Sequence, residues 1–163
     1  MTAFAHVLAQ PGSLAARRAL AAEWKAANDP RAELIEKQLA YRDLELRAET
    51  SSKSAHALRD QIRALVDRHG RAWAGRVADL VDSYEWKRGL VGQVKLRGDR
   101  FIQHAEELFL LAPIQHVDLT TPIPFDELVA STYLRKLVSL GANQQLDKIG
   151  DREAALLAST PYA

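Results

Sequence analysis

Val91-Gly-Gln-Val94-Lys-Leu96 is the first of three similar stretches in the second half of the chain, followed by Ile114-Gln-His-Val117-Asp-Leu119 and Leu134-Arg-Lys-Leu137-Val-Ser-Leu140. They begin at residues 91, 114 and 134, so 23 and then 20 residues separate their starts. A period of about 20 to 29 residues is typical of solenoids built from strand-helix units. One such unit cannot bury its apolar face alone, and units therefore stack. We predict that the three stretches are strands in a parallel ladder.

Alternation along a strand assigns the side chains of these stretches to two faces of the sheet. If Val91, Val94 and Leu96 point into the core, the residues between them point outwards. Mixed charges with amide and hydroxyl groups suit a polar protein surface better than a phosphate backbone. The prediction is a protein-binding strand face, and the alternative is a face that is only solvated. Its residues are Gln93, Lys95, Arg97, His116, Asp118, Thr120 and, in the third stretch, Lys136.

Helical periodicity covers residues 1–83, with breaks at residues that start or stop helices. Pro11-Gly12 ends a helix over residues 2–10, and Ser13 caps a second helix. Asn28-Asp29-Pro30 ends the second helix and starts a third, with Asp29 as cap and Pro30 at its first position. The third helix runs to residue 49, a fourth stops at Gly70 as its C-cap, and a fifth covers residues 71–82.

Apolar spacing predicts which side of each helix is buried. The expected buried residues are Leu14, Leu20 and Trp24 in the second helix, Leu34, Ile35, Leu39 and Leu46 in the third, Ala55, Leu58, Ile62, Leu65 and His69 in the fourth, and Trp73, Val77, Leu80 and Val81 in the fifth. Core packing is also the preferred role of the three tryptophans, although aromatic residues can be interface anchors.

The period changes from about 3.6 to 2 at Tyr84, which marks a predicted boundary between residues 83 and 84. Arg88-Gly89 lies between two strand-like stretches and predicts a hairpin turn. Helices are expected after each strand, over residues 101–111, 125–131 and 151–158. The predicted fold class is therefore α+β: a helical domain over residues 1–83 caps a strand-helix solenoid of about three units over residues 84–163, with a small parallel sheet.

Composition excludes several classes of function. Lys and Arg number 22 against 21 Asp and Glu, and a net charge of +1 gives no long-range field for nucleic acid or a membrane surface. The chain has no cysteine, which excludes disulfides and thiolate chemistry and fits a reducing compartment. Neither a secretory leader nor a stretch of membrane-spanning length is recognised. Cytoplasmic localisation is the expectation.

No catalytic or metal-binding pattern stands out. The histidines at positions 6, 56, 69, 104 and 116 do not form a spaced ligand set, and no nucleophile elbow, phosphate loop or dinucleotide fingerprint is present. Acidic pairs such as Glu106-Glu107 are explained by the charge preference of helix starts. We therefore expect no enzyme, no metal and no cofactor.

Three stretches of the sequence resemble a known protein family. Trp24-Lys-Ala-Ala-Asn-Asp-Pro-Arg-Ala-Glu-Leu-Ile-Glu-Lys-Gln-Leu39 resembles the signature of a bacterial repeat-companion domain, which precedes leucine-rich-repeat-like arrays. His69-Gly-Arg-Ala-Trp73 and Trp86-Lys-Arg-Gly-Leu90 are similar to the segment that joins that domain to its repeats. The resemblance implies a helical cap, right-handed strand-helix units and no catalytic residues. Ser139 departs from the leucine-rich pattern, which indicates a one-residue slip or bulge and leaves the facing of the third strand open.

The functional hypothesis that follows is a non-enzymatic cytoplasmic scaffold that binds a protein partner. An inhibitor or immunity protein that blocks an enzyme or toxin is one alternative, and an enzyme of unrecognised type is another. The end of the repeats is expected to expose an edge that a partner, a second copy or further repeats would cover. The residues of this open C-terminal edge are Ala155, Leu156, Leu157 and Tyr162.

Overall fold

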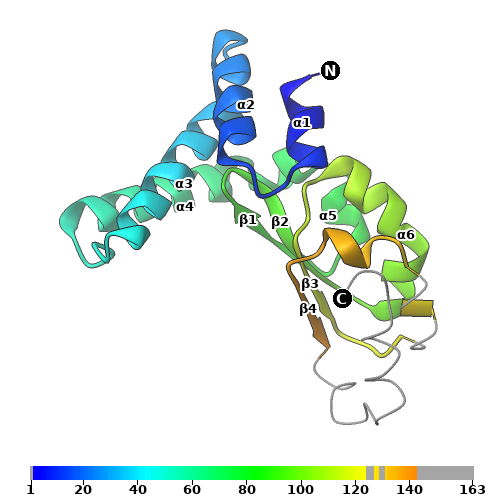
Figure 1. Cartoon of the computed structure of the whole chain (residues 1–163). Helices are drawn as coiled ribbons and strands as arrows, with labels where there is room; N and C mark the ends of the chain where they lie inside the picture. Colours follow the sequence, from blue (N-terminus) through cyan, green and yellow to red (C-terminus); the bar gives the residue numbers. More distant parts are fainter. Residues whose placement is uncertain (1, 124–126, 129–130, 143–163) are drawn as a thin grey trace. The chain divides into compact units, whose positions relative to one another are not determined.

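The computed structural model describes residues 2–123, 127–128 and 131–142 (Figure 1). These residues form six α-helices, one short 3-10 helix and four strands, so the predicted α+β class is confirmed. The chain divides into two compact units. Unit 1 comprises Met1–Gly75 and Trp86–Val91, and unit 2 comprises Arg76–Glu85 and Gly92–Ala163. The units alternate along the chain, whereas the sequence predicts one boundary between residues 83 and 84.

Unit 1 contains the helices α1 (Ala3–Ala9), α2 (Leu14–Ala26), α3 (Arg31–Leu46) and α4 (Lys53–Ala74). Thr2, Ser13 and Ser52 cap three of them, and each side-chain oxygen accepts a hydrogen bond of 3.2 Å from the amide three residues later. The predicted Ser13 cap is thus confirmed. The predicted start of α3 is wrong by one residue, because Pro30 is the N-cap and Arg31 the first helical residue. The Asp29 carboxylate nevertheless accepts a hydrogen bond from the Arg31 amide at 2.9 Å.

Two helices of unit 1 end in the same six-residue motif. After α2, the Asn28 amide donates to the Lys25 carbonyl and the Asp29 amide to the Trp24 carbonyl. After α3, the amides of residues 48 and 49 donate to the carbonyls of residues 45 and 44. This pattern requires a left-handed residue, and Asn28 and Ala48 have φ angles of 55° and 58°. Asparagine tolerates that conformation, whereas alanine is strained in it.

The predicted end of a helix at Gly70 is wrong. Helix α4 passes through Gly70 without a break and ends at Gly75, whose φ is 51°. Gly70 instead allows close packing, since a Cβ atom there would lie 3.4 Å from the Trp86 indole nitrogen and 3.2 Å from Val66 Cγ1. The predicted helix over residues 71–82 is correspondingly reduced to the one-turn α5 (Val77–Leu80).

The core of unit 1 is built from α1, α2 and α3 with the start of β2 (Leu90–Leu96). Of the predicted buried residues of α3, Leu34, Ile35 and Leu39 are buried, but Leu46 is 70% exposed because the helix runs past the core. Only Ala55 is fully buried among the five residues predicted for α4, and the other four are half-buried. The buried residues of the unit 1 core are Val7, Leu20, Ala21, Ile35, Leu39 and Leu90.

The hairpin turn belongs to unit 1 and joins β1 (Ser83–Lys87) to β2. Arg88 and Gly89 both have positive φ, as a two-residue hairpin turn of the I′ type requires, so the predicted turn is confirmed. The Gly89 amide donates to Gln38 Oε1 at 2.6 Å, and a Cβ atom at Gly89 would overlap Ile35. The turn is therefore docked closely against α3.

Unit 2 is built on the strands that follow the turn. Strand β2 is followed by α6 (Gly98–Leu111), β3 (His116–Leu119), the 3-10 helix η1 (Leu134–Lys136) and β4 (Ser139–Ala142). The sheet order is β1-β2-β3-β4, and β2 with β3 and β3 with β4 are parallel (Figure 1). The predicted parallel ladder is confirmed, and α6 begins three residues before the expected residue 101.

The register that the sequence pattern predicts for the third stretch is wrong. Residues 134–136 form η1, and the strand begins only at Ser139. Val94 pairs with Val117, and Val117 with Leu140, so equivalent positions are 23 residues apart in both steps. The third unit therefore aligns at Leu137 rather than at Leu134. Ser139 then occupies an outward position, and the sequence contains no slip or bulge.

The remaining predicted helices lie mostly beyond the described part of the chain. Glu127 and Leu128 are helical, but most of the predicted helix over residues 125–131 is outside the described residues, as is all of residues 151–158.

Candidate interaction face

The outward side of the parallel strands carries two rows of polar positions. Main-chain pairing aligns Gln93, His116 and Ser139 in one row and Lys95, Asp118 and Gly141 in the next. Between them, the inward column of Val94, Val117 and Leu140 supports the sheet, and the first two of these are buried. We call these five polar residues and Gly141 together the strand face: Gln93, Lys95, His116, Asp118, Ser139 and Gly141.

Side-chain hydrogen bonds connect the strands across this face. Gln93 Nε2 donates to Asp118 Oδ2 at 2.8 Å, which joins β2 to β3. His116 Nδ1 and Ser139 Oγ are 2.7 Å apart, which joins β3 to β4. The other oxygen of Asp118, Oδ1, lies where a Cβ atom at Gly141 would stand, so a larger residue at position 141 would displace this carboxylate. The face is thus a preorganised set of donors and acceptors rather than a row of independent side chains.

The predicted face residues divide into three groups. Gln93, Lys95, His116 and Asp118 share the strand face as predicted. Arg97 and Thr120 lie one residue past the ends of β2 and β3. Lys136 is a correction: it belongs to η1, and its ammonium lies 5.3 Å from the centre of the Tyr133 ring and 5.6 Å from that of Phe109.

The sequence pattern does not identify Ser139 and Gly141 as face residues. It aligns Leu134 with the first position of the earlier stretches, whereas Leu137 occupies that position in the structure. The equal spacing of 23 residues would have found them. The open C-terminal edge residues Ala155, Leu156, Leu157 and Tyr162 lie outside the described residues.

A charged rim follows the carboxyl ends of the strands in unit 2. Arg97 binds both oxygens of Asp99 at 3.0 Å, and these hydrogen bonds raise the pKa of Arg97 and lower the pKa of Asp99. Thr120 Oγ1 donates to Asp82 Oδ2 at 3.4 Å, and Arg100 Nη1 lies 3.6 Å from the other oxygen of Asp82. Arg97 and Asp99 are exposed, so their ion pair adds little stability and its main contribution is a pair of opposite charges at the surface.

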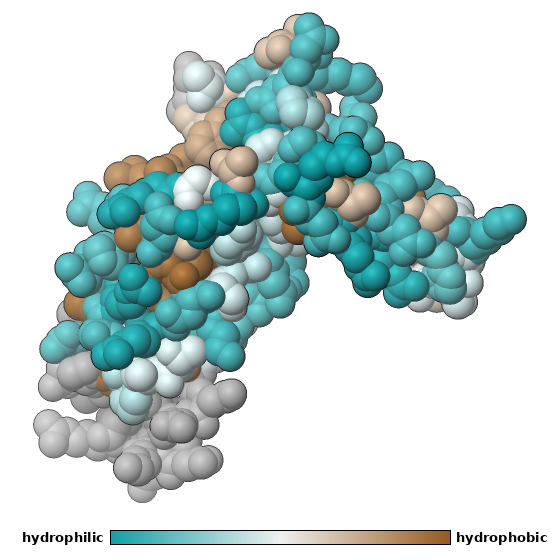
Figure 2. Space-filling model, turned by 180° about the vertical axis from the view of Figure 1, so that it is seen from behind, coloured by the Kyte–Doolittle hydropathy of each residue, from teal (hydrophilic) through white to brown (hydrophobic). Residues whose placement is uncertain are grey.

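Apolar side chains also reach the surface of unit 2. In α6, Leu110 is 65% exposed and Leu111 is 38% exposed, and Val138 just before β4 is 69% exposed. Figure 2 shows hydrophobic residues in brown at the surface, interrupted by hydrophilic residues in teal. Exposed charged residues such as Glu106 share the same helix, so we interpret these apolar residues as isolated surface side chains and not as a continuous apolar groove.

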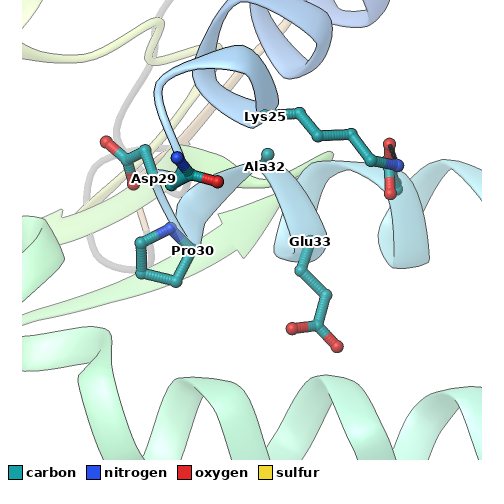
Figure 3. Close-up of a pocket in the computed structure, with 7 residues that line it drawn as sticks. Lys25, Asp29, Pro30, Ala32 and Glu33 are labelled. Atoms are coloured by element: carbon teal, nitrogen blue, oxygen red, sulfur yellow. Dashed lines mark hydrogen bonds and ion pairs between the residues drawn. The ribbon is translucent and has the colours of Figure 1, made fainter.

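A hollow of about 320 Å³ lies at the turn between α2 and α3 in unit 1 (Figure 3). Its charged groups are engaged with neighbours: Lys25 with Glu36 at 2.9 Å and Glu33 with Lys37 at 3.3 Å. The Asp29 carboxylate binds Arg31, which lowers the pKa of Asp29. Figure 3 shows Lys25, Asp29 and Glu33 pointing in different directions rather than toward one centre. The geometry therefore does not assemble a catalytic group here.

Contacts around the turn between α2 and α3 explain why Trp24 and Arg31 occur together in the Trp24-to-Leu39 motif. The Arg31 guanidinium lies 4.3 Å from the centre of the Trp24 ring, and Trp24 stacks on Phe4 with ring centres 6.4 Å apart. Trp73 meets Trp86 edge to face at 6.3 Å. Aromatic packing of this kind stabilises unit 1 and accounts for the tryptophans without an exposed anchor.

Two further observations concern the described residues only. No three of their His, Asp and Glu side chains come close enough together to hold a metal ion. None of the described helices combines the length and the apolar character needed to cross a membrane.

Comparison of the chain with protein-family models, with curated proteins and with solved structures finds no match. The repeat-companion resemblance therefore stays a prediction from the motifs.

Proposed function

We propose that this chain is a protein-interaction module without catalytic activity, in which unit 2 is a short leucine-rich-repeat-like solenoid that follows an N-terminal helical domain. The strand face is its binding surface. The observation that carries the proposal is the strict 23-residue register of three parallel strands, with a polar, hydrogen-bonded front and an aliphatic back. Repeat arrays of this geometry present such fronts to other macromolecules.

Chemistry favours a protein as the partner. The front combines a cation at Lys95 and a carboxylate at Asp118 with an imidazole at His116, a hydroxyl at Ser139 and an amide at Gln93. Single charges of both signs with neutral donors and acceptors match the mixed surface of a protein, whereas a phosphate backbone is bound chiefly by repeated cations. Because the front is already cross-linked by hydrogen bonds, little side-chain entropy is lost when a partner binds.

Site-specific photo-crosslinking tests the proposal in the native host. A photo-reactive amino acid replaces Lys95 on the strand face or, as a control, Gln103 on the exposed side of α6. We expect a discrete protein to be crosslinked from position 95 and not from position 103. Crosslinking of the same protein from position 103 alone would contradict the assignment of the face.

Calorimetry with the crosslinked partner then measures the energetic role of the face. The variant with Lys95→Glu and His116→Ala should weaken binding at least about tenfold, which corresponds to about 1.4 kcal/mol. The matched variant with Glu106→Lys and Gln103→Ala changes as many exposed residues on α6 and should bind like the wild type. Equal loss in both variants would refute the proposal. If the partner is an enzyme, its inhibition by this chain separates an inhibitor from a scaffold.

A further inference from the structure

Charge is distributed unevenly between the two units. Unit 1 contains 14 Lys and Arg residues against 9 Asp and Glu residues, which gives a net charge of +5. Unit 2 contains 8 against 12, which gives −4. The near-neutral total therefore conceals a basic unit, and the expectation that this chain attracts no anion holds only for the whole-chain average.

A buried guanidinium lies at the centre of unit 1. Arg17 of α2 is 0% exposed, and its terminal nitrogens donate to the carbonyls of Lys87 and Arg88 at 3.2 and 3.1 Å and to the Pro11 carbonyl at 3.1 Å. Its Nε atom is buried without a hydrogen-bond partner. No carboxylate forms an ion pair with Arg17 in the part of the chain that the structure describes. A buried charge normally has a counter-ion, so this one is unusual.

Two more arginines belong to the hairpin turn that Arg17 contacts and to the helix against which that turn packs. Arg88 in the hairpin turn is half-buried and donates only a long hydrogen bond, 3.4 Å, to the Gly12 carbonyl. Arg42 is also half-buried and lies one helical turn after Gln38, on the face of α3 that holds the turn. Neither forms an ion pair with another described residue.

The electrostatics agree with this grouping. Burial and then the charge of Arg88 lower the pKa of Arg17 to about 10. Burial and then the charge of Arg42 lower the pKa of Arg88. The charge of Arg88 thus acts on Arg17 and that of Arg42 acts on Arg88. None of the three guanidinium groups forms an ion pair with a carboxylate of the described residues.

We propose that Arg42 and Arg88, backed by the buried Arg17, form a binding site for a phosphate monoester. A guanidinium group presents paired N–H donors that match phosphate oxygens, and half-buried arginines lose less hydration than lysines would. A monoester carries a charge of about −1.5 to −2 at neutral pH, which offsets three cations better than one carboxylate does. A nucleic-acid backbone is a weaker fit, because it offers only one charge per phosphate.

Nuclear magnetic resonance of the arginine Nε–H groups tests this site in the full chain. Inorganic phosphate is titrated at pH 8, where the dianion predominates, against sodium chloride at the same ionic strength. We expect saturable shifts of the Arg42 and Arg88 signals with phosphate and none with chloride. The variant with Arg42→Gln and Arg88→Gln should lose at least about tenfold in affinity. The matched variant with Arg18→Gln and Arg47→Gln removes two exposed arginines of unit 1, one in α2 and one directly after α3, and should bind normally.

Three results would overturn the proposal: equal shifts with chloride, equal loss of affinity in the matched variant, or tighter binding of an oligonucleotide without terminal phosphate than of inorganic phosphate. Tryptophan fluorescence of both variants verifies that unit 1 is folded. Glycerol phosphate and a phosphoserine peptide then identify the source of the monoester. Tighter binding of the phosphoserine peptide places the ligand on a protein, and equal binding of both indicates a free phosphorylated molecule.

Discussion

Replacing Gly89 by alanine should strongly destabilise unit 1. Gly89 has a φ of 84°, and a Cβ atom there would overlap both the side chain and the backbone of Ile35. A left-handed conformation costs an L-residue about 1 to 2 kcal/mol, and inserting an atom into a packed contact costs about 1 to 3 kcal/mol. The expected loss in the free energy of unfolding is therefore about 2 to 5 kcal/mol, because neither Ile35 Cα nor the turn can move away without breaking the bond from the Gly89 amide to Gln38.

Urea denaturation followed by tryptophan fluorescence measures this loss selectively. All three tryptophans, Trp24, Trp73 and Trp86, belong to unit 1, so the signal reports the unfolding of that unit. Gly12→Ala is the matched control, since Gly12 is exposed and has no positive φ; it should change stability by less than about 0.5 kcal/mol. A Gly89→Ala variant within about 0.5 kcal/mol of the wild type would refute the docking of the turn on α3.

Three further predictions concern other positions. Ala48→Gly should raise the free energy of unfolding by about 0.5 to 1 kcal/mol in urea denaturation, because Ala48 is held at a φ of 58°; a destabilised variant would be inconsistent with the helix-end motif. Gly141→Ala should destabilise β4 by pushing Asp118 off its position, and the cost should fall by about 1 kcal/mol when Asp118→Ala is also present; amide exchange in the strands measures both, and simple additivity would argue against the contact. Arg31 lowers the pKa of Asp29 below 3.8, so the stabilisation from this carboxylate is complete above that pH and is lost as the pH falls through the lowered pKa; unfolding curves of the wild type and Asp29→Asn should converge in acid, and a constant difference at all pH values would exclude the ion pair as the cause.

Local signals predicted most helix starts and the hairpin turn. Ser13 satisfies amides at a helix start in any fold, and Arg88-Gly89 supplies the positive φ values that a two-residue turn demands. The helix caps and the turn are determined by interactions and φ angles within a few consecutive residues. The strand face follows from the same short-range alternation, which is why Gln93, Lys95, His116 and Asp118 were correctly grouped from their order in the chain.

Long-range contacts explain where the sequence pattern misled. Gly70 has the properties of a helix stop, but the contact with Trp86 makes it a position of close packing inside α4. Leu46 fits the apolar stripe of α3, yet the helix extends past the core and leaves it exposed. In both cases the outcome depends on contacts with residues far away in the chain, which are present for Gly70 and lacking for Leu46.

The amino-acid sequence by itself determined the class of the fold, the helix caps, the hairpin turn and the parallel sense of the strands, because each depends on local backbone preferences and on the period of apolar residues. Only the tertiary structure decided the register of the third strand, which replaced Lys136 by Ser139 and Gly141, since several leucines satisfy the apolar pattern and only main-chain pairing selects among them. The proposed arginine site also required the structure, because Arg17, Arg42 and Arg88 lie on three separate elements. Only the tertiary structure shows that Arg17 donates to the turn at Arg88 and that the same turn is bonded to Gln38, one helical turn before Arg42.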